Sequence, residues 1–171
     1  MIVFPNCKIN LGLQILNKRE DGFHNLETVF YPIHLRDVLE IIRSTDDKTE
    51  ANINFKSTGL IIEGYSHNNL CIKAYDLLKK DFPTLPPIQM HLHKTIPMGA
   101  GLGGGSSDGA FALKLLNEKF QLGLSSQQLI NYALQLGSDC PFFILNKPAF
   151  ATGRGELLEE ISLDLSAYHF A

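Results

Sequence analysis

A glycine-rich stretch in the middle of the chain has the composition of a phosphate-binding loop. Residues 97–110 read PMGAGLGGGSSDGA, with five glycines between Gly99 and Gly105. Glycine has no Cβ and readily takes positive φ, so backbone N–H groups can approach an anion closely. Residues 111–120 repeat apolar side chains at helical spacing, and a helix N-terminus adds further unpaired N–H groups. We therefore predict a loop that binds a phosphate chain and leads into a helix capped by Ser106 or Ser107.

Other motifs compete for the same residues. Gly99, Gly101 and Gly104 satisfy the G-x-G-x-x-G pattern of dinucleotide-binding folds. That pattern needs a second strand ending in an acid about twenty residues later, whereas residues 123–126 form a polar Gly-Leu-Ser-Ser turn. A P-loop is excluded because no Gly-Lys-Ser/Thr follows the glycines. A tight connection without a ligand stays open as an alternative.

Two charged residues could support phosphoryl transfer to an alcohol, which requires cations and a group that orients or deprotonates the acceptor hydroxyl. Lys8 lies in the stretch Cys7-Lys-Ile-Asn10, on the same strand face as Asn10. Asp139 follows a predicted helix and is held by Pro141, so its carboxylate could take a proton or pair with Lys8. The alternatives are a solvated outer face for Lys8 and an Asx turn or cap for Asp139.

A third cluster is suited to a flat ligand. Asp21-Gly-Phe-His24 combines a turn signal, an aromatic ring and an imidazole. Such a set can stack on a base and form hydrogen bonds to it, although an ordinary hairpin tip explains it equally well. His91 and His93 alternate on a predicted strand but have no further ligand at metal-binding spacing, so we treat them as surface residues.

The elements that must position these residues follow from their periodicity. Strand-like patterns cover residues 9–16, 28–33, 37–42, 51–55, 60–63, 88–94, 142–145, 149–153 and 156–158. Helical patterns cover residues 70–79, 111–120 and 129–136. Asn68 or Asn69 can cap the first helix, and Ser125 to Gln128 form a capping box for the last one, with Gly137 at its C-terminal end. Strands come first and helices follow, which favours an α+β fold.

Composition narrows the class of protein. The 171 residues are 44% hydrophobic and 19% charged, which is typical of a globular domain. A formal net charge of −3 with scattered lysines gives no basic face for nucleic acid. Cys7, Cys71 and Cys140 show no C-x-x-C spacing, and no segment reaches the roughly eighteen apolar residues of a membrane helix. We expect a soluble cytoplasmic protein that contacts neither nucleic acid nor membrane; its oligomeric state is not determined by the sequence.

Taken together, the motifs resemble one kinase family. KINL at 8–11, REDGFHNL at 19–26, the glycine stretch at 97–108, GSDCP at 137–141 and GRGE at 153–156 occur in the order found in 4-diphosphocytidyl-2-C-methyl-D-erythritol kinases of the GHMP superfamily. The resemblance implies a ribosomal protein S5 domain 2-like fold. It covers nearly the whole chain but only about the first half of a family member. Residues 1–160 are then expected to form the N-terminal ATP-binding domain, and residues 161–171 to begin the connection to a C-terminal domain that the chain lacks.

The resemblance also implies an activity. It is the ATP-dependent phosphorylation of the 2-hydroxyl of 4-diphosphocytidyl-2-C-methyl-D-erythritol, a small-molecule substrate, in the non-mevalonate route to isoprenoid precursors. Asp139 matches the general base and Lys8 the lysine beside it. Asn10, Phe23 and His24 match positions that hold the cytidine and methylerythritol groups, with Phe23 replacing the usual tyrosine. The backbone near Arg154 is expected to border the cytosine.

ATP with Mg²⁺ is the implied co-substrate. The residues expected along its phosphates are Pro97, Met98, Gly99, Ala100, Gly101, Leu102, Gly103, Gly104, Gly105, Ser106 and Ser107. Asn69, Leu70, Lys94 and Met98 are expected nearer the adenine and ribose. Asp108 stands where some members have asparagine, and neither its role nor the magnesium ligands follow from the sequence. We expect little activity from residues 1–171 without a second domain.

Two other functions remain open from the sequence. One is a GHMP kinase for a different small alcohol, such as homoserine or mevalonate, against which the Asp21-to-His24 motif argues. The other is a non-catalytic nucleotide-binding or interaction module, which would keep the glycine loop but would not need Lys8 and Asp139.

Overall fold

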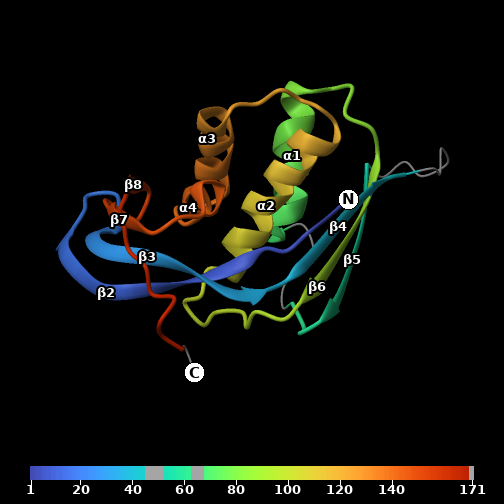
Figure 1. Ribbon diagram of the computed structural model, residues 1–171. Helices are drawn as coiled ribbons and strands as arrows, with labels where there is room; N and C mark the ends of the chain where they lie inside the picture. Colours follow the sequence, from blue (N-terminus) through green and yellow to red (C-terminus); the bar gives the residue numbers. More distant parts are fainter. Residues whose placement is uncertain (45–51, 63–67, 170–171) are drawn as a thin grey trace.

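In the computed structural model, which describes residues 1–44, 52–62 and 68–169, helices cover one side of a strand layer (Figure 1). The described strands form two four-stranded sheets. The first sheet has the order β1 (Ile2–Val3), β4 (Val38–Arg43), β6 (Ile88–Lys94) and β5 (Ile53–Gly59). The second has the order β2 (Asn6–Lys18), β3 (His24–Arg36), β7 (Ala149–Thr152) and β8 (Leu157–Glu160). The helices are α1 (Leu70–Asp81), α2 (Gly104–Lys119), α3 (Ser126–Leu136) and α4 (Cys140–Leu145).

Strand β6 shows how the first sheet meets the helices. It pairs antiparallel with β4 and parallel with β5, and its side chains alternate between buried and more exposed positions. Ile88, Met90 and Leu92 are buried with Leu39 and Ile41 of β4 in the core. The same period of two continues to Lys94, which is only 1% exposed. A lysine therefore occupies the last inward position of the strand, directly before the glycine loop.

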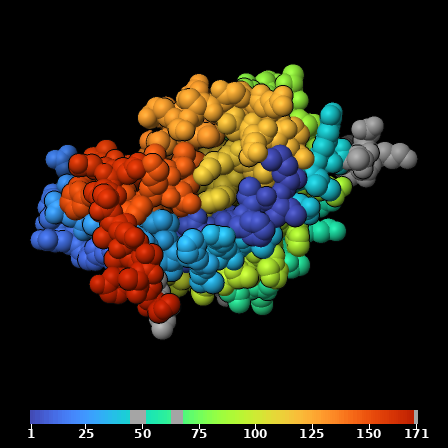
Figure 2. All heavy atoms as spheres, viewed as in Figure 1, coloured from blue at the N-terminus to red at the C-terminus, as the bar shows by residue number. Residues whose placement is uncertain are grey.

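The two long strands β2 and β3 form the antiparallel hairpin at the left of Figure 1. The register places Lys8 opposite Pro32 and Lys18 opposite His24, with irregularities along the strands. Strand β7 pairs with β3 from Thr28 to Phe30. Figure 2 shows the C-terminal segment, in red, lying across β3, where the Leu165 N–H donates to the Tyr31 hydroxyl oxygen at 3.1 Å.

Several predicted helix ends are confirmed. The Asn69 side chain caps α1 by accepting a hydrogen bond from the Cys71 N–H at 2.9 Å. Ser125 and Gln128 form the expected capping box of α3. The prediction for α2 is wrong in its details, because the N-cap is Gly103 in the left-handed region with φ 70° and no side chain caps the helix. Ser106 and Ser107 lie inside the helix instead.

Residues 142–145 were expected as a strand and instead form part of helix α4. Pro141 lies in the first turn of this helix, where its missing N–H costs nothing and its fixed φ suits the helix. Phe142, Phe143 and Ile144 are all buried. An apolar run that is buried on every side has no periodicity, so its sequence cannot distinguish a short helix from a strand.

The strand expected over residues 51–55 is found as β5 at Ile53–Gly59, with Ala51 outside the described residues. Of the strand expected over residues 60–63, Leu60 to Ile62 are not in a strand and Glu63 lies outside the described residues. No helix in the part of the chain that the structure describes is long and apolar enough to cross a membrane.

Candidate active site

The glycine loop lines a cavity of about 550 Å³. Gly99, Gly101 and Gly103 all have φ between 70° and 75°, a backbone conformation that residues other than glycine rarely adopt. Residues 97–106 form one wall with Asn68, Asn69 and Leu70, which lie at the start of α1. Phe55, Ser57, Ile62 and Asp108 also contribute. The cavity thus brings together the predicted loop residues with Asn69, Leu70 and Met98.

Two glycines pack so tightly that a side chain would collide with the site. A Cβ at Gly103 would lie 2.9 Å from the Phe143 ring and 3.3 Å from Lys8 Cε. A Cβ at Gly104 would lie 2.8 Å from Ile96 Cγ2 and 2.9 Å from Lys94 Nζ. The start of α2 is therefore close to two lysines, Lys8 at Gly103 and Lys94 at Gly104.

Lys8 and Asp139 meet beside the loop, as the sequence predicted. The Lys8 N–H donates to the Leu102 carbonyl at 2.9 Å, which ties β2 to the loop. Its Nζ lies 3.7 Å from Asp139 Oδ2 and 4.5 Å from the centroid of the Phe30 ring. Lys8 is 5% exposed, and this burial lowers the pKa of its ammonium, while the charge of Asp139 acts in the opposite direction. The Asp139 side chain is 35% exposed, so its carboxylate remains accessible to a ligand.

Asn10 supports this pair. Lys8 Nζ donates to Asn10 Oδ1, and Asn10 Nδ2 donates to Thr28 Oγ1 at 3.1 Å. Lys8 and Asn10 thus lie on one face of β2, as expected, and the carbonyl side of the amide is fixed toward the ammonium. A chain of polar groups leads from β3 through Asn10 and Lys8 to Asp139.

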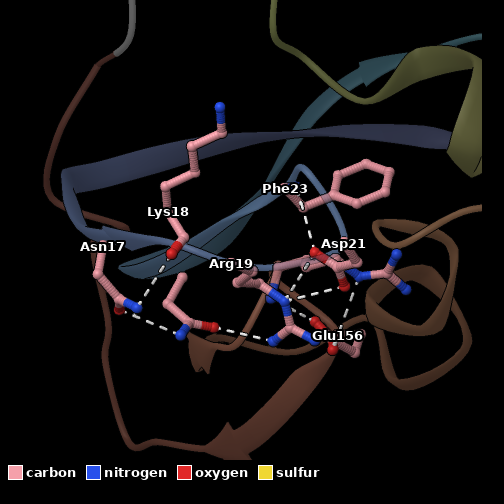
Figure 3. A network of polar contacts seen from close by, with 8 residues as sticks. Asn17, Lys18, Arg19, Asp21, Phe23 and Glu156 are labelled. Carbon is pink, nitrogen blue, oxygen red and sulfur yellow. Dashed lines mark hydrogen bonds and ion pairs between the residues drawn. The ribbon is translucent and has the colours of Figure 1, made fainter.

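The hairpin tip and the turn after β7 form a second polar cluster (Figure 3). Arg19 Nε contacts the Asp21 carboxylate at 3.0 Å, and the Phe23 N–H donates to Asp21 Oδ1 at 3.1 Å. Arg154 Cζ lies 4.7 Å from the centroid of the exposed Phe23 ring. The Arg154 N–H donates to Glu156 Oε2 at 2.5 Å. The structure therefore places Phe23 beside Arg154, and His24 follows as an exposed residue at the start of β3.

The turn after β7 also approaches the Lys8–Asp139 pair. A Cβ at Gly155 would lie 3.7 Å from Asp139 Oδ1. The predicted cytidine-binding cluster, the predicted base and the glycine loop are therefore connected by successive contacts through Gly155 and Lys8.

Lys94 lies elsewhere than expected. It is not among the cavity-lining residues, and its Nζ is buried between two carboxylates, donating to Asp37 Oδ2 and to Asp108 Oδ2, the latter at 2.8 Å. Burial between these acids leaves Lys94 no direct path to adenine or ribose, so its position does not support that prediction. Ser107 is likewise fully buried and outside the cavity lining.

Asp37, the buried partner of Lys94 close to the start of α2, is a residue that sequence reasoning missed. Its Oδ1 accepts hydrogen bonds from the N–H groups of Thr95 at 2.6 Å and Ile96 at 2.9 Å. The available signal was an acid directly before the strand-like segment Val38-Leu-Glu-Ile-Ile42. Its partners lie 57 to 59 positions away in the sequence, so only the pairing of β4 with β6 identifies them.

A protein-built magnesium site is not found among these groups. No cluster of three or more His, Cys, Asp or Glu suitable for a metal ion occurs in the residues that the structure describes. Asp108 is the single carboxylate among the described residues that line the cavity, and it is bound to the Lys94 ammonium. A cation beside that ammonium would be repelled, so the cavity residues by themselves do not fit Mg²⁺.

Comparison with known proteins agrees with this geometry. Residues 69–147 match the family of GHMP kinases N terminal domains. A 4-diphosphocytidyl-2-C-methyl-D-erythritol kinase from Bacteroides fragilis is 55% identical over 168 residues, which are 98% of this chain and 60% of that protein. One from Porphyromonas gingivalis is 46% identical over 172 residues, covering 100% of this chain and 61% of that protein. The chain therefore spans about 60% of the length of these curated relatives.

Comparison with solved structures indicates the same class of protein. A crystal structure of 4-(cytidine 5'-diphospho)-2C-methyl-D-erythritol kinase matches with a TM-score of 0.80 and 35% identity, over 96% of this chain and 56% of that one. The mevalonate kinase of Methanococcus jannaschii matches with a TM-score of 0.68 at 16% identity, over 95% and 56% of the two chains, which supports the fold alone. The chain is similar to the GHMP kinase family over residues 69–147 and has the ribosomal protein S5 domain 2-like fold of that family's N-terminal domain. Within that family it is similar to the 4-diphosphocytidyl-2-C-methyl-D-erythritol kinases.

Proposed function

We propose that this chain provides the ATP-binding loop and the catalytic base of a kinase that phosphorylates the 2-hydroxyl of 4-diphosphocytidyl-2-C-methyl-D-erythritol. The observation that supports this most directly is the position of Asp139. It lies within 3.7 Å of Lys8 Nζ, and the same carboxylate borders Gly155, whose turn approaches Phe23 through Arg154. A cytidine-bearing alcohol held at the hairpin tip would thus extend toward the carboxylate beside the glycine loop.

The N–H groups of residues 99–105 and the N-terminus of α2 are suited to bind the phosphates of ATP. The γ-phosphoryl group would then lie on the Lys8 side of the loop, because Lys8 Cε is close to Gly103. In the reaction, the substrate hydroxyl oxygen forms a bond to the γ-phosphorus while the bond to the β,γ-bridging oxygen breaks and ADP leaves. Asp139 accepts the hydroxyl proton. Lys8 orients Asp139 and offsets charge on the transferring group.

The hairpin tip provides the specificity in this proposal. The Phe23 ring, with Arg154 against it, offers a face on which cytosine can stack. His24 and Asn10 add donors and acceptors for the pyrimidine and for the methylerythritol hydroxyls. Residues 1–160 would form the ATP-binding domain, with residues 161–169 following it across β3. Mg²⁺ stays a prediction, and we expect it to be held chiefly by the phosphates of ATP.

The test is release of ADP by the full-length protein with ATP and 4-diphosphocytidyl-2-C-methyl-D-erythritol, beside the variant Asp139→Asn. We expect turnover by the parent protein and a loss of at least about 100-fold in kcat in the variant, because a positioned base contributes about 10²–10⁴. Homoserine and mevalonate serve as control acceptors. Turnover with either control but not with the cytidine compound would point to another small-alcohol kinase. Nucleotide binding without turnover of any acceptor would support the non-catalytic module.

A further inference from the structure

A buried cluster of three charged residues lies beneath the start of α2. It consists of Asp37 between β3 and β4, Lys94 at the end of β6, and Asp108 in α2. Asp37 is 0%, Lys94 1% and Asp108 3% exposed. Lys94 Nζ contacts both carboxylates and would lie 2.9 Å from a Cβ at Gly104. The cluster therefore supports the residues that begin the phosphate-binding helix.

The charges of the cluster do not balance when both acids are ionised, because two carboxylates face one ammonium. Both carboxylate oxygens of Asp37 accept hydrogen bonds. Oδ2 accepts from Lys94 Nζ, and Oδ1 accepts from the N–H groups of Thr95 and Ile96. Asp108 accepts from Lys94 on Oδ2, whereas its Oδ1 is buried and has no hydrogen-bond partner among the described atoms. A buried carboxylate oxygen without a donor is costly in the ionised form. Asp108 is thus the member of the cluster that is best suited to hold a proton.

Three titratable groups from other parts of the fold face Asp108. Lys94 on β6 favours the ionised form of Asp108, whereas Asp37 between β3 and β4 favours the neutral form, as does burial. The third is the Cys71 thiol of α1, whose pKa is raised well above its ordinary value by burial, so it stays uncharged near neutral pH. The net effect of burial, Lys94 and Asp37 raises the pKa of Asp108 to about 8.

Asp108 also lines the cavity formed by the glycine loop. A nucleotide triphosphate brings several negative charges to that loop, in a setting where the low local dielectric strengthens repulsion. We propose that Asp108 is protonated whenever the nucleotide is bound, so that the Asp37–Lys94–Asp108 cluster is electrically neutral beneath the phosphates and an ionised Asp108 must take up a proton on binding. This inference rests on the proposed binding of ATP at the glycine loop, and it makes Asp108 a positioning residue whose protonation couples nucleotide affinity to pH.

The test is isothermal titration calorimetry of the full-length protein with a non-hydrolysable ATP analogue at pH 7, 8 and 9. Affinity should be constant below the pKa of free Asp108 and fall above it, because the ionised acid must first gain a proton. With that pKa at about 8, Kd should rise about tenfold between pH 7 and pH 9. Binding at pH 8 should take up about half a proton per nucleotide, measured by comparing two buffers of different ionisation enthalpy.

The variant Asp108→Asn should bind the analogue with a Kd that changes far less over this range and should take up no proton beyond that of the analogue itself. Asp76→Asn, which removes the same charge from an exposed position of α1, should behave like the parent. Thermal unfolding checks that the variants are folded. If Asp108→Asn does not fold, the proton uptake measured with the parent protein at pH 8 tests the inference by itself. Binding with no pH dependence, or the same dependence in Asp108→Asn, overturns the inference but leaves the proposed function intact. Absence of binding at every pH overturns both.

Discussion

The Lys8 ammonium is held between the Asp139 carboxylate, 3.7 Å away, and the face of the Phe30 ring, whose centroid is 4.5 Å away. Burial lowers the pKa of Lys8, and the Asp139 carboxylate opposes this effect without cancelling it. Lys8 thus belongs to both the core and the candidate site, since its backbone N–H binds the glycine loop at Leu102. This dual role makes it the first residue to test.

We predict that kcat falls on the alkaline side as Lys8 loses its proton, at a pH below the ordinary pKa of 10.5 for lysine. The direction follows from the lowered pKa, because the charged form is lost earlier than in an exposed lysine. In Lys8→Arg this alkaline decline should disappear, since a guanidinium stays charged throughout. The measurement is a pH profile of kcat from pH 6 to 10. The same decline in both proteins would assign it to another group.

Lys8→Met is the matched neutral variant. It should reduce kcat by about 100-fold at pH 7, because the transferring phosphoryl group loses a nearby cation. The KM for ATP should change little if the glycine loop holds the phosphates. A large rise in the KM for ATP with an unchanged kcat would instead make Lys8 a nucleotide-binding residue.

Phe23 offers a test of cytidine recognition. Phe23→Leu should raise the KM for the cytidine substrate by about two- to tenfold, because an offset-stacked aromatic contact contributes roughly 0.5–1.5 kcal/mol. Phe23→Tyr keeps the ring and should differ little from the parent. Neither change should alter the KM for ATP, since Phe23 does not line the glycine-loop cavity. Equal KM values for the cytidine substrate in the leucine and tyrosine variants would exclude stacking on this ring.

Gly104 and Gly105, the first two residues of α2, allow two matched alanine variants that test how tightly the start of this helix is packed. Gly104→Ala should destabilise the protein by about 1–3 kcal/mol, because its Cβ would collide with Ile96 and Lys94 Nζ. Gly105→Ala should be neutral or slightly stabilising, since its Cβ would contact only Met98 Cε at 3.9 Å and alanine favours a helix. Urea unfolding without nucleotide measures both variants. Equal stabilities would show that the start of α2 adjusts readily.

The consecutive elements β6, glycine loop and α2 could be predicted because each has a local signal. Strand β6 alternates, the loop needs positive φ, and the helix repeats its apolar side chains. Asn69 and the Ser125 capping box were predictable for the same reason, since a cap depends only on residues within one turn. Residue types left the pairing of Lys8 with Asp139 open, and the family resemblance implied it; the structure places the two side chains in contact.

The buried cluster could not be predicted, because no local pattern joins Asp37 to Lys94. These residues meet only through the antiparallel pairing of β4 with β6, which sets Val38 opposite His93. Lys94 was therefore assigned to the nucleotide on the basis of resemblance, although the alternation of β6 already predicts that it points inward with Met90 and Leu92. A lysine at an inward position of a strand is a signal for a buried acidic partner.

Loss of charge should affect the stability of the protein differently at the two acids of this cluster. Asp37→Asn should destabilise the protein by about 2–4 kcal/mol, since Asp37 accepts two backbone hydrogen bonds and that of Lys94, and only part of this set can bind an amide. Asp108→Asn should be tolerated, because Lys94 keeps Asp37 as its partner and the cluster becomes neutral. Urea unfolding at pH 7 compares the two variants.

The effect of Asp108→Asn on stability should depend on pH in a defined direction. Folding raises the pKa of Asp108 from 3.8 to about 8, so the folded protein binds a proton that the unfolded chain has released between these values. The stability of the parent should therefore decline as pH rises from about 4 to about 8, while an asparagine adds no such dependence. The variant should match the parent at pH 5 and exceed it at pH 9 by roughly 4 kcal/mol, because each of the three pH units from 5 to 8 contributes about 1.4 kcal/mol. A stability difference that is the same at both pH values would mean that Asp108 is ionised throughout, held by Lys94 alone.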